Sequence, residues 1–191
     1  MQMSGGHLLA AGLDGGNTIM LSSPATGYFI YLQGGYGMIF RKSTLDDCEK
    51  VYDRIWELER KTLPYEKFAE IYSTQLGSGQ YYCLVAEKDD AILAVLNLRF
   101  EEQLHHVEKI AEVMEFSVDP ACRSRGIGKR MFAKALEIAK DLGCAQLELS
   151  SNRLRTDAHR FYLREGMHDF HLKFSKRLTG EDSAENAIGK I

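Results

Sequence analysis

A glycine-rich, basic loop at the start of an amphipathic helix is the feature that most constrains this sequence. Residues 122–139 read CRSRGIGKRMFAKALEIA, with Gly126 and Gly128 set between pairs of basic residues. Apolar residues then recur at helical period, so a helix is expected to begin at these glycines. A helix start carries backbone N–H groups without partners and the positive end of the peptide dipoles, and glycine lets the backbone approach a ligand closely. The stretch therefore predicts a site for an anionic group.

The composition makes that anion site a local feature. The chain has 191 residues, 45% of them hydrophobic, and a formal net charge of −3, which fits one globular domain and argues against nucleic acid as a partner. No apolar run approaches the ~20 residues that cross a membrane, and no Lys or Arg precedes Arg41, so neither a membrane segment nor a secretory signal is expected. The four cysteines show no metal-ligand spacing and are expected to be reduced thiols of a cytoplasmic protein without a metal.

The pattern along the chain predicts one mixed α/β domain between two different ends. Residues 1–37 form a glycine-rich extension, whose last part, YFIYL followed by QGG, is typical of a hairpin strand. Residues 38–178 are expected to form a mostly antiparallel sheet flanked by helices, in the order strand, helix, helix, three strands, helix, strand, helix, strand. The last strand is expected over 167–178, and residues 179–191 form a polar tail.

Three phosphate-binding patterns compete for the loop. A P-loop requires Ser or Thr after the lysine, and Lys129 is followed by Arg130. A dinucleotide fingerprint requires a third glycine where this chain has Met131. The pattern R/Q-x-x-G-x-G/A, placed between a strand and an amphipathic helix, is matched at every defined position from Arg123 to Gly128.

With that loop the chain resembles the GCN5-related N-acetyltransferase (GNAT) family, over roughly residues 38–178. The stretch LSSNRLRTDAHRFYLREGM, residues 149–167, is similar to the second half of the family pattern, and SNRLRTDAHRFYLREG with LHHV looks most like the aminoalkylphosphonate N-acetyltransferase branch. Met167 departs from the aromatic residue usual after Gly166. The resemblance implies acetyl-CoA as co-substrate and a small-molecule amine as acceptor. By fold analogy alone, a homodimer is expected.

The resemblance also implies which residues hold acetyl-CoA. The pyrophosphate is expected at the N–H groups of the loop, with Asn152 on the pantetheine arm and the thioester carbonyl near Val118. The implied cofactor residues are Phe116, Ser117, Val118, Arg123, Arg125, Gly126, Ile127, Gly128, Lys129, Arg130, Asn152, Ala158 and Phe161.

Two carboxylates are candidates for the base that deprotonates the amine. On a regular strand Glu112 shares a face with Phe116 and Val118, and desolvation among such neighbours would make it a better base. Glu115 would point to the other face and is the second candidate, although a bulge would change that alternation. Either Glu could instead be a solvated or ion-paired carboxylate. Tyr162 is the implied acid for the departing thiolate, with packing in a helix interface as its alternative role.

An anionic acceptor would need cationic partners. Arginine matches a phosphonate well, and the candidate substrate residues are His105, His106, Arg153, Arg155 and His159. As neighbours on a strand, the two histidines of LHHV would face opposite sides and would not share a metal. The rival acceptors are an aminoglycoside, a polyamine or a protein N-terminus, and the rival class is a non-catalytic acetyl-CoA-binding module.

Overall fold

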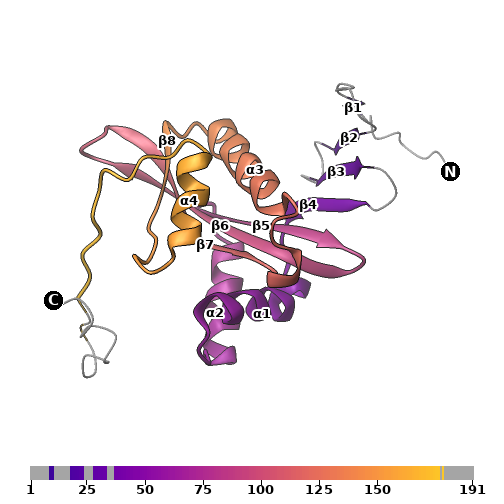
Figure 1. Cartoon of the computed structure of the whole chain (residues 1–191), viewed down its shortest axis with the longest axis horizontal. Helices are drawn as coiled ribbons and strands as arrows, with labels where there is room; N and C mark the ends of the chain where they lie inside the picture. The colour runs from indigo at the N-terminus through magenta and orange to yellow at the C-terminus, as the bar shows by residue number, and fades with distance from the viewer. Residues whose placement is uncertain (1–8, 11–17, 24–27, 34–36, 177, 179–191) are drawn as a thin grey trace. The chain divides into compact units, whose positions relative to one another are not determined.

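The computed structural model describes residues 9–10, 18–23, 28–33, 37–176 and 178, with side chains described from residue 37 onward. The chain divides into two compact units, Met1–Leu149 and Ser150–Ile191. The first unit holds the sheet and its helices, and the second holds one helix and an extended segment (Figure 1).

The sheet of the first unit has eight strands in chain order. Every neighbouring pair is antiparallel except β7 and β8, which are parallel because a helix connects them. The strands are β1 (Leu9–Ala10), β2 (Thr18–Ser23), β3 (Tyr28–Gln33), β4 (Met38–Lys42), β5 (Tyr81–Lys88), β6 (Ala91–Gln103), β7 (Glu108–Val118) and β8 (Gln146–Leu149).

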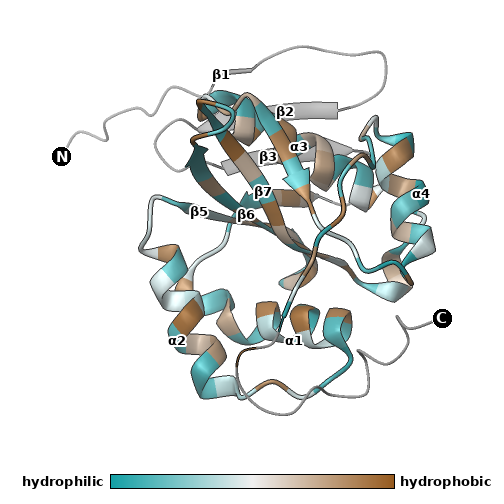
Figure 2. Cartoon of the chain, turned by 90° about the vertical axis from the view of Figure 1, so that its left-hand side faces the viewer, coloured by the Kyte–Doolittle hydropathy of each residue, from teal (hydrophilic) through white to brown (hydrophobic). Residues whose placement is uncertain are grey.

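Helices cover both faces of this sheet, as Figures 1 and 2 show from two directions. On one face lie η1 (Leu45–Asp47), α1 (Cys48–Glu59) and α2 (Tyr65–Leu76), where Val51 and Ile55 pack against β5 and β6. On the other lies α3 (Ile127–Asp141), which follows the short η2 (Pro120–Cys122) and buries Met131 and Ala135. Of the described helices, none combines the length and the apolar character that a membrane crossing requires.

Local sequence signals set the ends of these elements, as predicted. Pro64 is the N-cap of α2, because its fixed φ suits a helix start. The β5–β6 hairpin turns at Asp89 and Asp90, which have φ of 50° and 61°. Both residues are in the left-handed region that Asp tolerates better than most residues, and that tight turns require.

A bulge in β7 reverses its side-chain alternation at Met114. In the register with β6, Leu98 lies opposite Val113 while the adjacent Asn97 lies opposite Glu115, so Met114 is an extra residue. Glu112 and Glu115 therefore face the same side, towards α1 and α2. The expectation that Glu115 points to the opposite face from Glu112 is wrong, and the bulge is the physical reason.

The bulge also determines which side chains at the end of β7 point towards the core beneath α3. Phe116 and Val118 pack in the core beneath α3, together with Ala111 and Val113 from before the bulge. The predicted common face of Glu112, Phe116 and Val118 is therefore not observed. Glu112 lies on the face away from α3, and its neighbours there are polar.

The N-terminal strands extend the sheet beyond the expected domain. Phe29 of β3 lies opposite Phe40 of β4, which confirms the strand pairing of the predicted hairpin, while its turn at 34–36 lies outside the described residues. Strands β1 and β2 lie within the predicted glycine-rich extension, where no strand was expected. The boundaries 1–37, 38–178 and 179–191 stay predictions.

The second unit contains the predicted short helix but not the predicted strand. Helix α4 spans Thr156–Arg164, and Gly166, with φ of 89°, follows its end as expected. The described residues of 167–178 have no regular secondary structure, so the last expected strand is not observed there. The alternation that predicted it is present, but Phe170, Leu172 and Phe174 are exposed. A strand also requires a backbone partner, which alternation alone does not supply.

Candidate active site

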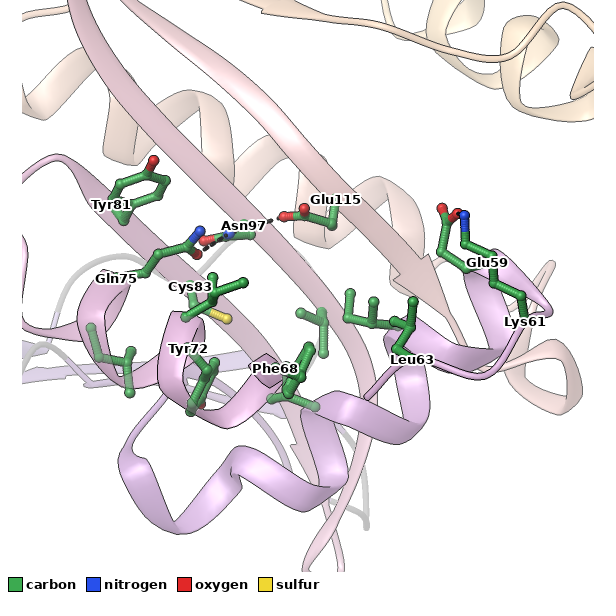
Figure 3. A pocket seen from close by; sticks show the side chains of 15 residues that line it. Glu59, Lys61, Leu63, Phe68, Tyr72, Gln75, Tyr81, Cys83, Asn97 and Glu115 are labelled. Atoms are coloured by element: carbon green, nitrogen blue, oxygen red, sulfur yellow. Dashed lines mark hydrogen bonds and ion pairs between the residues drawn. The ribbon is translucent and has the colours of Figure 1, made fainter. Parts of the chain in front are cut away.

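A cavity of about 320 Å³ lies between helices α1 and α2 and the sheet. Most of its wall is apolar, as in sites that hold small organic molecules. The polar or titratable side chains of the lining are Glu59, Lys61, Tyr72, Gln75, Tyr81, Cys83, Asn97 and Glu115. Figure 3 shows Gln75, Asn97 and Glu115 in one row along the sheet, with Glu59 and Lys61 together at the other end.

Two carboxylates, Glu59 and Glu115, line this cavity, and Glu115 is the one on the central strand β7. Asn97 Nδ2 donates one hydrogen bond to Glu115 Oε2 at 2.9 Å and another to Gln75 Oε1 at 2.9 Å (Figure 3). Burial raises the pKa of Glu115, and the hydrogen bond from Asn97 only partly opposes that rise. A carboxylate with a raised pKa is a stronger base than an exposed one, which is what deprotonating an ammonium group requires.

Glu112 lies on the same face but outside the cavity lining. Its Oε2 accepts a hydrogen bond from Arg99 Nη2 at 2.6 Å, and the same guanidinium is 2.9 Å from Glu101 Oε2. An ion pair of this kind occupies a carboxylate oxygen that a base would use. Between the two candidates, the arrangement around Glu115 is the better suited to proton transfer.

Cys83 is the thiol that lines the cavity. Burial raises its pKa to about 12, so it stays protonated at neutral pH. The thiolate is the nucleophilic form of cysteine, and Cys83 is therefore poorly suited to carry an acetyl group covalently.

The loop before α3 has the backbone that an anion site needs. Ser124 and Gly126 have φ of 60° and 78°, and this left-handed turn leads directly into the first turn of α3. The N–H groups of that turn lack partners within the helix and carry the positive end of its dipole. Arg123 Nε donates to the Val118 carbonyl at 3.1 Å, which ties the loop to the end of β7. The guanidinium of Arg130 instead packs over the Phe40 ring, 5.5 Å from its centroid.

In the second unit, Asn152 organises the loop before α4. Its side-chain Oδ1 accepts from the Leu154 N–H at 2.9 Å, and its carbonyl oxygen accepts from the Arg155 N–H at 2.9 Å. The ring of His159 lies against the same carbonyl, with Nε2 at 2.9 Å. Three of the predicted site residues, Asn152, Arg155 and His159, are thus together, and Arg153 is exposed, as Asn152 and Arg155 are.

Tyr162 lies on α4 beside Phe161, with ring centroids 5.3 Å apart. Burial raises the pKa of Tyr162, and the nearby Arg155 lowers it to a smaller extent. A phenol with a raised pKa stays protonated at neutral pH, as a proton donor must.

His105 and His106 lie in the turn between β6 and β7, not on a strand as expected. Their ring centroids are 4.1 Å apart, so they do not face opposite sides. Residues 104–107 form this turn, so the strand alternation on which that expectation rested does not extend to the two histidines. His106 Nε2 is 3.9 Å from Glu148 Oε1 on β8, and both histidines lie outside the cavity lining. Over the described residues, no group of three or more His, Cys, Asp and Glu could hold a metal ion.

The family of the chain follows from a match over more than half of its length. Residues 45–167 match the model of the acetyltransferase (GNAT) family. The chain belongs to that family. It is an acetyl-CoA-dependent N-acetyltransferase, which confirms the enzyme class and the co-substrate that the family resemblance implied.

Individual proteins resemble the chain in sequence or in fold. The chain is 36% identical to the aminoalkylphosphonate N-acetyltransferase of Salmonella typhimurium over 138 residues, which is 72% of this chain and 90% of that protein. A transcriptional regulator from Bacillus halodurans has a similar fold, with a TM-score of 0.69 at 23% identity over 74% of this chain and 99% of its own. The aminoglycoside N-acetyltransferase AAC(6')-Iy, in complex with CoA, also gives 0.69, at 14% identity over 78% and 99%. These structures confirm the mixed sheet with flanking helices.

Several residues that line the cavity were not predicted from the sequence. Asn97 carried a usable signal, because it is a single amide inside the apolar run AILAVLNL. Gln75 and Lys61 carried none, since each lies among other polar residues of a helix or a loop. Only the packing of α2 and of the loop before it against the sheet brings these two side chains to the cavity.

Proposed function

We propose that the acceptor amine binds in the cavity between α1–α2 and the sheet, and that Glu115 removes its proton. The observation that carries this proposal is a carboxylate in a mostly apolar cavity, hydrogen-bonded through one oxygen by a buried amide. The ammonium N–H passes its proton to Glu115, and the nitrogen lone pair attacks the carbonyl carbon of acetyl-CoA. The C–S bond then breaks as the new C–N bond is completed, and the nitrogen loses its second proton to solvent to give the neutral amide. Glu112, held by Arg99, is the second candidate for the base.

The remaining roles come from the family resemblance. Tyr162 gives the departing thiolate its proton, which the raised pKa of its phenol supports. The loop from Arg123 to Arg130 holds the CoA pyrophosphate through its N–H groups, and Asn152 contacts the pantetheine arm. Transfer is direct, because the thiol lining the cavity is protonated at neutral pH. The homodimer and the cytoplasmic location stay predictions.

An aminoalkylphosphonate is the acceptor we favour, on the strength of the 36% identical relative that is named for that activity. Its amine would lie at Glu115, and its short alkyl chain would contact the apolar wall. Lys61 is the cationic side chain of the cavity lining. His105, His106, Arg153, Arg155 and His159 stay candidates for the phosphonate end.

Turnover on a panel of amines tests the reaction and the acceptor together. With acetyl-CoA present, CoA release would be followed with a thiol-reactive dye on aminoalkylphosphonates, amino-sugar phosphates, polyamines and aminoglycosides. We expect the highest kcat/KM on the phosphonates, and a kcat about 10²-fold lower in Tyr162→Phe, which lacks the acid. Turnover confined to cationic amines would contradict the acceptor but keep the enzyme class. Acetyl-CoA binding without any turnover would favour the binding-module alternative.

Replacing Lys61 by methionine tests how the cavity recognises the anionic end. We expect Lys61→Met to raise KM for an aminoalkylphosphonate about 10-fold, as the loss of one charge-assisted contact does, and to leave KM for an alkylamine of equal length unchanged. Lys67→Met is the matched control, since Lys67 is exposed on α2, pairs with Glu70 and does not line the cavity. An equal rise in KM for both amines would show that Lys61 does not bind the phosphonate group.

A further inference from the structure

Asn97 is an unusual residue for the centre of a buried strand. Ala94, Val95, Leu96 and Leu98 around it in β6 are all buried and apolar, and Asn97 itself is 7% exposed. Burying an amide among such neighbours is unfavourable unless its polar atoms find partners. A side chain retained at this position therefore calls for an explanation.

The hydrogen bonds of Asn97 use one end of the amide only. Both Nδ2 hydrogens are donated, one to Gln75 on α2 and one to Glu115 on β7, each at 2.9 Å. Its Oδ1 is buried and has no hydrogen-bond partner among the described residues. An unsatisfied buried acceptor lowers the stability of the fold. Packing alone would favour a valine or a leucine here, so the two hydrogen bonds that the amide donates are the reason for an asparagine at this position.

Gln75 and Glu115 together determine which way the amide of Asn97 points, since an ionised carboxylate can only accept a hydrogen bond. Because Gln75 Oε1 accepts one Nδ2 hydrogen, the second hydrogen is directed at Glu115, and a flipped amide would bring Oδ1 against the carboxylate. Hydrogen bonding to Glu115 within the described residues involves Oε2. The other carboxylate oxygen, Oε1, is thus left for a ligand in the cavity.

We propose that Asn97, oriented by Gln75, is a positioning residue that holds the Glu115 carboxylate towards the acceptor amine. This proposal rests on the role of Glu115 as the base. Three elements, α2, β6 and β7, meet in the row Gln75–Asn97–Glu115, so the direction of the base is tied to the packing of α2 on the sheet (Figure 3). Precise orientation of a catalytic group accounts for a large part of enzymatic rate acceleration.

The charge around Glu115 gives the proposal a pH signature. Burial raises its pKa most, Glu59 and Glu112 raise it further, and only the hydrogen bond from Asn97 opposes them. The other titratable groups of the cavity lining are Lys61, Tyr72, Tyr81 and Cys83. Removing the amide therefore removes the contact that favours the ionised base. The pH below which activity is lost should rise in such a variant.

Two variants of Asn97 test this. Asn97→Leu removes the donor and keeps the branching at Cγ, and Asn97→Asp keeps the shape but sets a second carboxylate beside Glu115. We expect the acidic limb of the pH profile of kcat/KM to move to higher pH in both, further in Asn97→Asp, and kcat/KM at neutral pH to fall about 10-fold or more. Gln103→Leu is the matched control: it removes an amide–carboxylate hydrogen bond elsewhere on β6, from Gln103 to Glu101, and should leave the profile unchanged.

The Glu115→Gln background separates positioning from general damage. If Asn97 acts through Glu115, then Asn97→Leu should lower the residual activity of Glu115→Gln by less than about two-fold. The factor by which the same substitution lowers wild-type activity should be about five times larger or more. A ¹³C NMR titration of the Glu115 carboxyl should show its pKa higher in Asn97→Leu than in wild type, whether or not turnover is seen. An unmoved carboxyl titration, an unshifted acidic limb or equal losses in both backgrounds would overturn the proposal. A shifted titration in a protein that acetylates no amine would instead overturn the proposed base role, and the positioning role with it.

Discussion

Glu115→Gln is expected to lower kcat/KM for the acceptor amine by about 10²- to 10⁴-fold, the range typical of a lost general base. Glutamine keeps the shape of the side chain and can still accept the hydrogen bond from Asn97, but it cannot take up the proton of the ammonium group. Glu112→Gln is the competing variant and should cost less activity, because its main effect is to remove one partner of Arg99. Steady-state kinetics on the same amine, with acetyl-CoA saturating, compares the two.

Glu101→Gln serves as the control for both variants. Like Glu112, Glu101 pairs with Arg99, and it lies outside the cavity lining. Folding should not explain the loss of activity. The raised pKa of Glu115 means that the folded state binds its proton more tightly than the unfolded state does, so the folded protein loses stability as the pH rises through that pKa. Glutamine is neutral at every pH, and Tm at neutral pH should not fall. A larger loss in Glu112→Gln than in Glu115→Gln would assign the base to Glu112.

Most of the fold could be predicted from local sequence signals. Helix starts, tight turns and amphipathic periods depend on residues within a few positions of one another, as at Pro64, Asp89–Asp90 and Gly126. The strand expected over 167–178 shows the limit of such signals. A pairing partner is a property of the whole fold, and the alternation of Phe170, Leu172 and Phe174 carries no information about it.

The orientation of the two candidate bases could not be read from the sequence. An alternating pattern carries through a strand only while the register with its neighbour is regular, and one extra residue reverses every later side chain. EVMEFSV is a regular β sequence by composition, and no glycine or proline marks Met114 as the extra residue. The bulge is visible only in the pairing of β7 with β6.

The predicted anion-binding partners illustrate a different limit. Arg123 and Gly126 could be assigned from the sequence because loop and helix are contiguous. The set of His105, His106, Arg153, Arg155 and His159 was assembled by residue type from separate segments. The described structure brings Arg155 and His159 together at Asn152, and separately the two histidines of the β6–β7 turn. Residue type indicates what a side chain can bind, and the tertiary fold decides which side chains act together.

Arg41→Met is expected to lower the free energy of unfolding by about 3–5 kcal/mol, the range measured when one partner of a buried ion pair is removed. Arg41 donates to both Asp47 oxygens, at 2.6 and 2.8 Å, and its Nε donates to Glu87 at 2.6 Å. Its side chain is 13% exposed and that of Asp47 is 5% exposed. Methionine would leave two carboxylates desolvated without a cation. Urea unfolding at pH 7 measures the loss, and Lys67→Met, which breaks an exposed pair with Glu70, should cost less than about 1 kcal/mol.

The pH dependence of that loss identifies its cause. Burial alone would raise the pKa of Asp47, but the hydrogen bonds from Arg41 and Thr44 outweigh it and hold the pKa below its usual 3.8. A carboxyl with a lowered pKa stabilises the fold above its unfolded-state pKa, and that contribution is lost as the pH falls through the folded-state value. In Arg41→Met the hydrogen bonds from Arg41 no longer oppose the rise in the Asp47 pKa that burial causes. Asp47 therefore takes up its proton at a higher pH than in wild type. The stability difference between the two proteins should therefore narrow as the pH falls, whereas a loss caused by packing alone would stay constant. Because Asp47 precedes α1 and Tyr72 of α2 donates to the Thr44 carbonyl at 2.8 Å, the same variant should also loosen both helical walls of the cavity.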